Sequence, residues 1–90
     1  MIDSPTITVE FYGMPRQRAG RTEITLQART LGELLLAVQT ACPDLTLLEP
    51  DGRIVPHIRV SLGGQRFLTD TAEELLPGER VLILSADAGG

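Results

Sequence analysis

The sequence predicts an α+β domain in which a sheet of about five strands packs on one main helix, in the order β-β-α-β-β-β. Three observations support this prediction: segments in which apolar and polar residues alternate, one long segment with helical spacing of its apolar residues, and Gly- or Pro-containing turns between them. The 90 residues suffice for one domain, and aliphatic residues must form its core because only 3% of residues are aromatic.

The first two strands are predicted to form a hairpin. Residues 6–12 alternate strictly, and their inward set is Ile7, Val9 and Phe11. Residues 22–28 alternate again, and their inward set is Thr22, Ile24, Leu26 and Ala28. The intervening residues 13–21 contain two glycines and a proline, which predicts a loop.

The main helix is predicted to begin at Thr30. The segment that starts there reads TLGE, a capping box in which the Thr30 hydroxyl accepts a backbone N–H of the first turn and Glu33 accepts the N–H of Thr30. Pro43 ends the helix at or just before Cys42. One apolar stripe follows the helical spacing: Leu31, Leu34, Leu35, Val38 and Cys42.

Three further strands follow the helix. We expect an irregular segment after Pro43 with a short helical turn at residues 45–48, and then a strand at residues 58–62. Gly63 and Gly64 suit a two-residue hairpin turn, after which residues 65–68 pair back. Residues 69–79 are expected to contain one more helical turn and a turn at Pro77–Gly78, and residues 80–85 form the last strand.

The last strand is apolar at four successive positions, from Val81 to Leu84. In a sheet covered on one face, two of these side chains must point away from the helix, either Leu82 and Leu84 or Val81 and Ile83. One interpretation is a central strand, or a strand whose second face a nearby loop covers. The other is an apolar patch that docks a partner.

Composition and single residues exclude several functions. The net charge of −4, with scattered acidic residues, argues against nucleic acid or an anionic membrane as a partner. A single cysteine, Cys42, allows no internal disulfide, which fits a protein of the reducing cytoplasm, and its place on the apolar stripe predicts a buried thiol. The one histidine, His57, has no other ligand at a suitable spacing, which argues against a metal site. All eight basic residues are arginine, and no Ser, His and Asp arrangement suggests a nucleophile.

The chain ends in SADAGG, and these last residues are of no use to the fold. We expect a domain at residues 1–86 and a flexible tail at residues 87–90. Because Gly89 and Gly90 have no Cβ, the five residues from Ala86 to Gly90, about 17 Å long when extended, fit a narrow channel in another enzyme. The terminal carboxylate of Gly90 is the one unusual chemical group that the sequence offers.

The order of elements, the helix start TLGELL, the final strand PGERVLIL and the terminal AGG together resemble the ubiquitin-like sulfur carriers of the ThiS/MoaD family. This family includes the thiamine-thiazole sulfur carrier and the small subunit of molybdopterin synthase. The resemblance covers Thr6 to Gly90 and implies a ubiquitin-like β-grasp fold with a mixed sheet.

The resemblance also implies a mechanism. An E1-like enzyme would adenylate the Gly90 carboxylate with ATP, and a persulfide sulfur donor would convert it to a thiocarboxylate that a synthase uses. Gly89 and Gly90 would then be the functional residues, and no cofactor would be bound. The partner-binding face would include Leu82, Leu84 and, as flanking surface, Phe67 and Arg66.

Three other functions stay open. The chain would be part of an enzyme if it is the small subunit of molybdopterin synthase, although many such subunits carry a Pro-Pro before the tail where this chain has SADAGG. It would be a ubiquitin-like protein modifier if Gly90 forms isopeptides, or a plain interaction domain if the tail is incidental. Asp87 is unexpected so close to a carboxylate that is to be adenylated.

Overall fold

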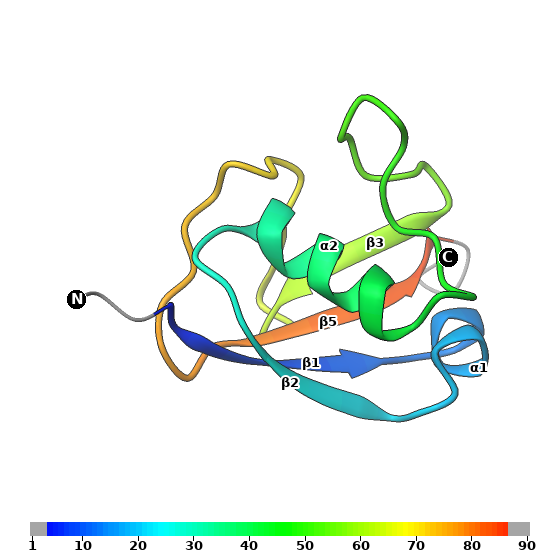
Figure 1. The fold of residues 1–90 in the computed structure, drawn as a ribbon, viewed down its shortest axis with the longest axis horizontal. Helices are drawn as coiled ribbons and strands as arrows, with labels where there is room; N and C mark the ends of the chain where they lie inside the picture. The colour runs from blue at the N-terminus through cyan, green and yellow to red at the C-terminus, as the bar shows by residue number, and fades with distance from the viewer. Residues whose placement is uncertain (1–3, 87–90) are drawn as a thin grey trace.

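The computed structural model describes residues 4–86, which form a mixed sheet of five strands and two helices (Figure 1). The predicted fold class is confirmed. The elements follow in the order β1 (Thr6–Phe11), α1 (Met14–Ala19), β2 (Glu23–Gln27), α2 (Leu31–Ala41), β3 (Ile58–Leu62), β4 (Arg66–Phe67) and β5 (Arg80–Ser85).

The last strand of the chain lies at the centre of the sheet. The strand order is β2-β1-β5-β3-β4, so β5 pairs with β1 on one side and with β3 on the other. The β1–β5 pair is parallel, whereas the other pairs are antiparallel. β1 and β5 therefore end at the same edge of the sheet, next to α1 (Figure 1).

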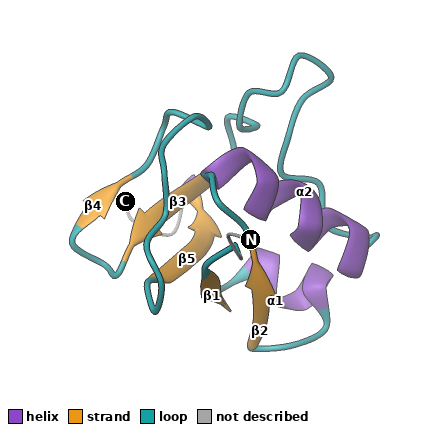
Figure 2. Ribbon diagram, turned by 60° about the vertical axis from the view of Figure 1, so that its left-hand side comes forward, coloured by secondary structure: helices purple, strands orange, loops and turns teal. Residues whose placement is uncertain are grey.

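The helix α2 lies across one face of the sheet, and within residues 4–86 no helix lies across the opposite face (Figures 1 and 2). The predicted stripe of α2 is buried, and so are Ile7, Val9 and Phe11 of β1. In β2, Ile24 and Leu26 are half-buried, but Thr22 is exposed and lies outside the strand. The core between α2 and the sheet therefore forms mainly from the aliphatic residues that the alternation predicts.

Thr30 caps α2 as predicted, because its hydroxyl accepts the N–H of Glu33 at 3.2 Å. The Glu33 carboxylate, however, accepts the N–H of Arg29 and not that of Thr30. Two free N–H groups of the first turn, those of Leu31 and Gly32, donate instead to carbonyl groups of the later segment at residues 71–73.

That later segment contains no helical turn, so this prediction is wrong. Residues 69–79 lie wholly within the described part of the chain and form turns and one isolated bridge, Thr30 to Glu74. This irregular path lets the segment accept the N–H groups of α2 and donate the Leu75 N–H to the Arg29 carbonyl. The local helical pattern is therefore overridden by contacts with a distant element. The turn at Pro77–Gly78 is present.

The helical turn expected at residues 45–48 is also wrong. The Gln39 side-chain oxygen accepts the N–H groups of Leu47 and Leu48 at 2.6 and 2.8 Å, and Leu48 pairs with Ile54. These bonds hold residues 45–48 in an irregular loop, which the sequence around them does not reveal.

The predicted loop between the first two strands contains the six-residue helix α1. Pro15 in its first turn and Gly20 at its end, with φ of +73°, suit a short helix as well as a loop. The ring of Pro15 is buried against the domain, and α1 contacts β5. Tertiary packing of this kind decides between helix and loop for so short a segment.

The Gly63–Gly64 hairpin turn is confirmed, because both residues have positive φ (+58° and +75°). No helix in residues 4–86 is long and apolar enough to cross a membrane.

Candidate functional site

The candidate site begins where β5 ends. Tyr12 donates its N–H to the carbonyl of Ile83 on the β1 side, and Ser85 pairs with Ile58 on the β3 side. The N–H of Ala86 then donates to the His57 carbonyl at 2.9 Å. The fold therefore holds the chain from both sides almost up to the point where the predicted tail starts.

The predicted tail residues themselves, Asp87 to Gly90, lie outside the described residues. The functional roles of Gly89 and Gly90, and the domain boundary after residue 86, stay predictions. The structure places what precedes them: a central strand whose end faces α1 (Figure 1).

The four apolar residues of β5 divide between the two faces of the sheet. Val81 and Ile83 are fully buried under α2, whereas Leu82 and Leu84 are only half-buried on the opposite face. The first interpretation is right that the strand is central. Leu82 and Leu84 nevertheless keep part of their surface exposed, as the docking interpretation requires.

Neighbouring strands add three side chains beside these leucines. Leu84 is opposite Arg59 and Leu82 is opposite Ser61 on β3, and Ser61 is in turn opposite Phe67 on β4. Directly opposed residues share a face of the sheet. We call this set the outer face: Arg59, Ser61, Phe67, Leu82 and Leu84.

Phe67 is the most exposed apolar member of the outer face, at 55% exposure. The guanidinium of Arg59 lies 5.3 Å from the centre of its ring, a cation–π contact. Of the predicted partner-binding residues, the structure thus brings Leu82, Leu84 and Phe67 together. Arg59 was missed, although the alternation of β3 could have found it, because the buried Ile58 and Val60 flank it.

Arg66 does not join this set. It is opposite Leu62, on the other face of the hairpin, and its guanidinium forms an ion pair with Glu73. The hydrogen bond from Arg66 lowers the pKa of the Glu73 carboxyl. Arg66 therefore links β4 to the segment before β5 and lies apart from the two leucines.

A polar network borders the outer face on the β1 side. The Glu10 carboxylate accepts hydrogen bonds from the Tyr12 hydroxyl and from Arg80, and Glu10 is opposite Leu82 in the sheet. The bond from Tyr12, followed by that from Arg80, lowers the pKa of Glu10, and the same contact with Glu10 raises the pKa of Tyr12. The carboxylate is thus held in its charged form beside the apolar side chains.

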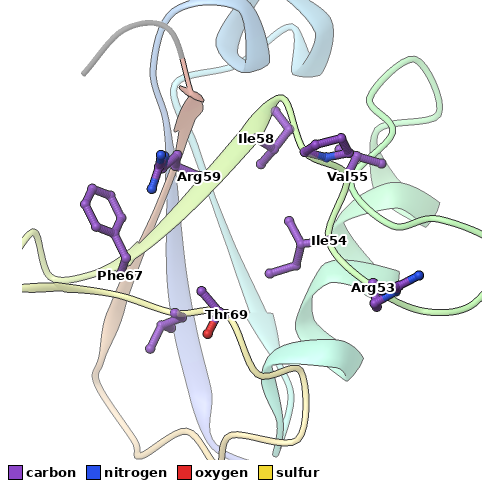
Figure 3. A pocket seen from close by; sticks show the side chains of 9 residues that line it. Arg53, Ile54, Val55, Ile58, Arg59, Phe67 and Thr69 are labelled. Carbon is purple, nitrogen blue, oxygen red and sulfur yellow. The ribbon is translucent and has the colours of Figure 1, made fainter. Parts of the chain in front are cut away.

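Two hollows lie near the outer face and the end of β5. One, of about 470 Å³, lies at the end of β5 and is lined by Met14, Pro15, Arg18, Asp44, Leu45, Thr46, His57, Ile58 and Ser85. The other, of about 300 Å³, lies between the β3–β4 hairpin and residues 53–56 (Figure 3).

The described residues contain no cluster of His, Cys, Asp and Glu that would hold a metal ion. His57 is exposed, and Cys42 is buried on the α2 stripe as predicted. The candidate site therefore consists of the end of β5, hydrogen-bonded on both sides, and of the partly apolar outer face. The described residues show no evident reactive side chain there.

No model of a known protein family matches the sequence, and no curated protein matches it significantly. Solved structures do resemble the fold. The small archaeal modifier protein SAMP1 from Haloferax volcanii has a TM-score of 0.80 and 21% identity, over 94% of this chain and 99% of that one. A putative molybdopterin converting factor, subunit 1, from Pyrococcus furiosus has a TM-score of 0.70 and 20% identity, over 91% and 98%.

Urm1 from Trypanosoma brucei has a TM-score of 0.58 and 23% identity, over the whole of both chains. At these identities the likeness establishes the fold, which is the ubiquitin-like β-grasp that the sequence resemblance implies.

Proposed function

We propose that this chain is a sulfur carrier whose terminal Gly90 carboxylate is adenylated by an E1-like enzyme and then converted to a thiocarboxylate. The observation that carries the proposal is the central strand β5, hydrogen-bonded on both sides and leading directly into Asp87–Gly90. The fold likeness to a putative molybdopterin converting factor subunit supports it. The proposal takes Gly90 as the terminal residue.

The chemistry would proceed in three balanced steps. The carboxylate attacks the α-phosphorus of ATP, which releases pyrophosphate and forms an acyl-adenylate. A persulfide displaces AMP and forms an acyl disulfide. A thiol then cleaves the S–S bond, leaves as a mixed disulfide and frees the thiocarboxylate, which donates its sulfur to a small molecule on a synthase.

The folded domain would act as a protein substrate and not as an enzyme. Its work would be to dock on the activating enzyme and the synthase, so that the tail enters their active sites. Ordering a four-residue tail costs conformational entropy, and contacts elsewhere must offset this cost. The outer face suits that task, because Leu82, Leu84 and Phe67 are exposed or half-exposed in the free domain.

A second candidate function is protein modification, favoured by the likeness to SAMP1. In that case an amine of a target protein would displace AMP and form an isopeptide bond. The protein contains no lysine, so it would form no polymeric conjugates linked through its own side-chain amines. The small-subunit role in molybdopterin synthase would instead require a stable complex with a larger subunit.

Intact-mass spectrometry tests the proposal. The full chain, incubated with its cognate E1-like enzyme, ATP and a persulfide donor, should gain the mass difference between a sulfur and an oxygen atom. Deletion of Gly90 should abolish the gain, and Asp87→Asn should retain it. No gain in the wild-type chain, or an equal gain in the deletion variant, would overturn the proposal. Higher-mass conjugates without a sulfur gain would favour the modifier.

A further inference from the structure

β3 is longer than the edge strand that covers it. β3 spans Ile58–Leu62, whereas β4 spans only Arg66–Phe67 and pairs with Ser61 and Leu62. The last backbone bond of this pair joins the Leu68 N–H to the Val60 carbonyl at 2.8 Å. Beyond it the chain turns away, so the first two residues of β3 have no β4 partner in the described structure.

The 300 Å³ pocket lies at this gap in the sheet edge (Figure 3). Its floor is apolar and comes from Ile54, Val55, Ile58 and Leu68, of which only Ile54 is half-exposed. In Figure 3, Phe67 and Arg59 lie on one side of the pocket and Arg53 on the other, with Ile54 between them. The gap is therefore a hollow with room for one or two apolar side chains.

The backbone of β3 offers a hydrogen-bond acceptor to this gap. Because Val60 bonds to Leu68, strand alternation turns the N–H and C=O of Ile58 toward the same side. The Ile58 N–H donates to the Val55 carbonyl at 3.2 Å, whereas the Ile58 carbonyl accepts no backbone N–H of residues 4–86. An extended segment that entered the gap would donate an N–H to it and continue the sheet where β4 stops.

The charge at the rim contrasts with that of the whole chain, which carries −4. The Arg59 guanidinium lies over the Phe67 ring, and no carboxylate of the described residues lies within 4.0 Å of it. Arg53, on the opposite rim, is 81% exposed and pairs with Asp51. The Arg59 guanidinium beside an apolar floor complements a segment that carries both carboxylates and aliphatic side chains.

We propose that this gap docks an extended acidic segment of a partner protein, which adds to the sheet beside Ile58 and Arg59. An aliphatic side chain of the segment would occupy the floor formed by Ile54 and Leu68, and a carboxylate would bind Arg59. Phe67 and Arg59 also belong to the outer face, so one partner can cover the gap and the outer face together. This docking proposal does not depend on the thiocarboxylate chemistry proposed for Gly90, so the failure of one proposal does not decide the other.

Selection from a displayed library of random peptides of about nine residues, against the full-length chain, tests the proposal. The enriched peptides should combine aliphatic and acidic residues. In a titration followed by backbone NMR, they should shift the signals of residues 53–59 and 66–69 most. Arg59→Glu should weaken binding about tenfold or more, because it replaces attraction by repulsion.

Arg21→Glu is the matched control, since Arg21 is also exposed but lies just before β2, at the opposite edge of the sheet. It should leave the affinity nearly unchanged. Two further changes test the apolar floor and the backbone pairing separately. Ile54→Ala should weaken binding by removing part of the floor, and N-methylation of the peptide amide that bonds to the Ile58 carbonyl should weaken it by removing that hydrogen bond. The proposal is overturned if no peptide is enriched, if the shifts map to β2 and α2, or if Arg59→Glu and Arg21→Glu weaken binding equally.

Discussion

The two faces of the central strand β5 differ although its four middle residues, from Val81 to Leu84, are all apolar. Val81 and Ile83 have no exposed surface and pack under α2, whereas Leu82 and Leu84 alternate with them and stay half-exposed. The same residue types therefore fill the core on one side of the strand and form part-exposed surface on the other. The α2 side stabilises the domain, and the outer face leaves apolar surface available for a partner.

The largest expected effect is on stability, at the α2 side. Ile83→Ala leaves a cavity in a packed core and should lower the free energy of unfolding by about 2–4 kcal/mol. Leu84→Ala, on the same strand, should cost about 1 kcal/mol or less because its side chain already meets solvent. Urea unfolding of both variants measures the difference, and equal losses would show that the two faces do not differ in this way.

The next effect concerns docking. Leu84→Ala should lower the rate of thiocarboxylate formation about tenfold at a low concentration of the carrier, because contacts that offset tail ordering are lost. Leu36→Ala is the control: Leu36 is 56% exposed but lies on α2. A similar loss of rate in both variants would mean that the outer face is not the docking surface.

The helix α2 covers one face of the sheet, and the stability of this helix depends on the cap at its first turn. Thr30→Ala removes the hydroxyl that accepts the Glu33 N–H and should cost about 1 kcal/mol of unfolding free energy. The rate of sulfur transfer at a temperature far below unfolding should not change. Thr30→Ser, which keeps the hydroxyl, should restore most of the stability, and a failure to do so would argue against the capping role.

The smallest expected effect is the pH dependence of stability that comes from Glu10, at the border of the outer face. The pKa of Glu10 lies below its usual value, mainly through the hydrogen bond from Tyr12. A lowered folded-state pKa gives stability that is present above the unfolded pKa and is lost as the pH falls through the folded one. In NMR titrations, Tyr12→Phe should move the pKa of Glu10 back toward the usual range, and an unchanged pKa would show that Tyr12 is not its main cause.

The alternation of residues predicts β1 and β3 well because each of these strands has one buried face. Ile7 and Val9 are found where the pattern places them, and so is the Gly63–Gly64 turn. The helix α1 and the irregular path of residues 69–79 could not be predicted, because packing against β5 and capping of α2 decide them. Of the candidate docking residues, Leu82 and Leu84 came from the resemblance, because the apolar run alone left them open against Val81 and Ile83. Arg59 was missed, although the alternation of β3 indicates that it points away from the core.

The resemblance predicted the ubiquitin-like fold, which the structural neighbours confirm. It also predicted Arg66 as part of the docking surface, but the hairpin register places Arg66 opposite Leu62 and its charge pairs with Glu73. A two-residue strand such as β4 has too little alternation to assign its faces from sequence.

The central claim is that the sulfur enters at Gly90 and that the folded domain only delivers it. Trypsin cleavage after Arg80 releases residues 81–90, a peptide without cysteine or methionine. Fragmentation of this peptide, after incubation with the E1-like enzyme, ATP and a persulfide donor, should place the added sulfur on Gly90. Sulfur on Asp87, or only on the peptide that contains Cys42, would contradict the account.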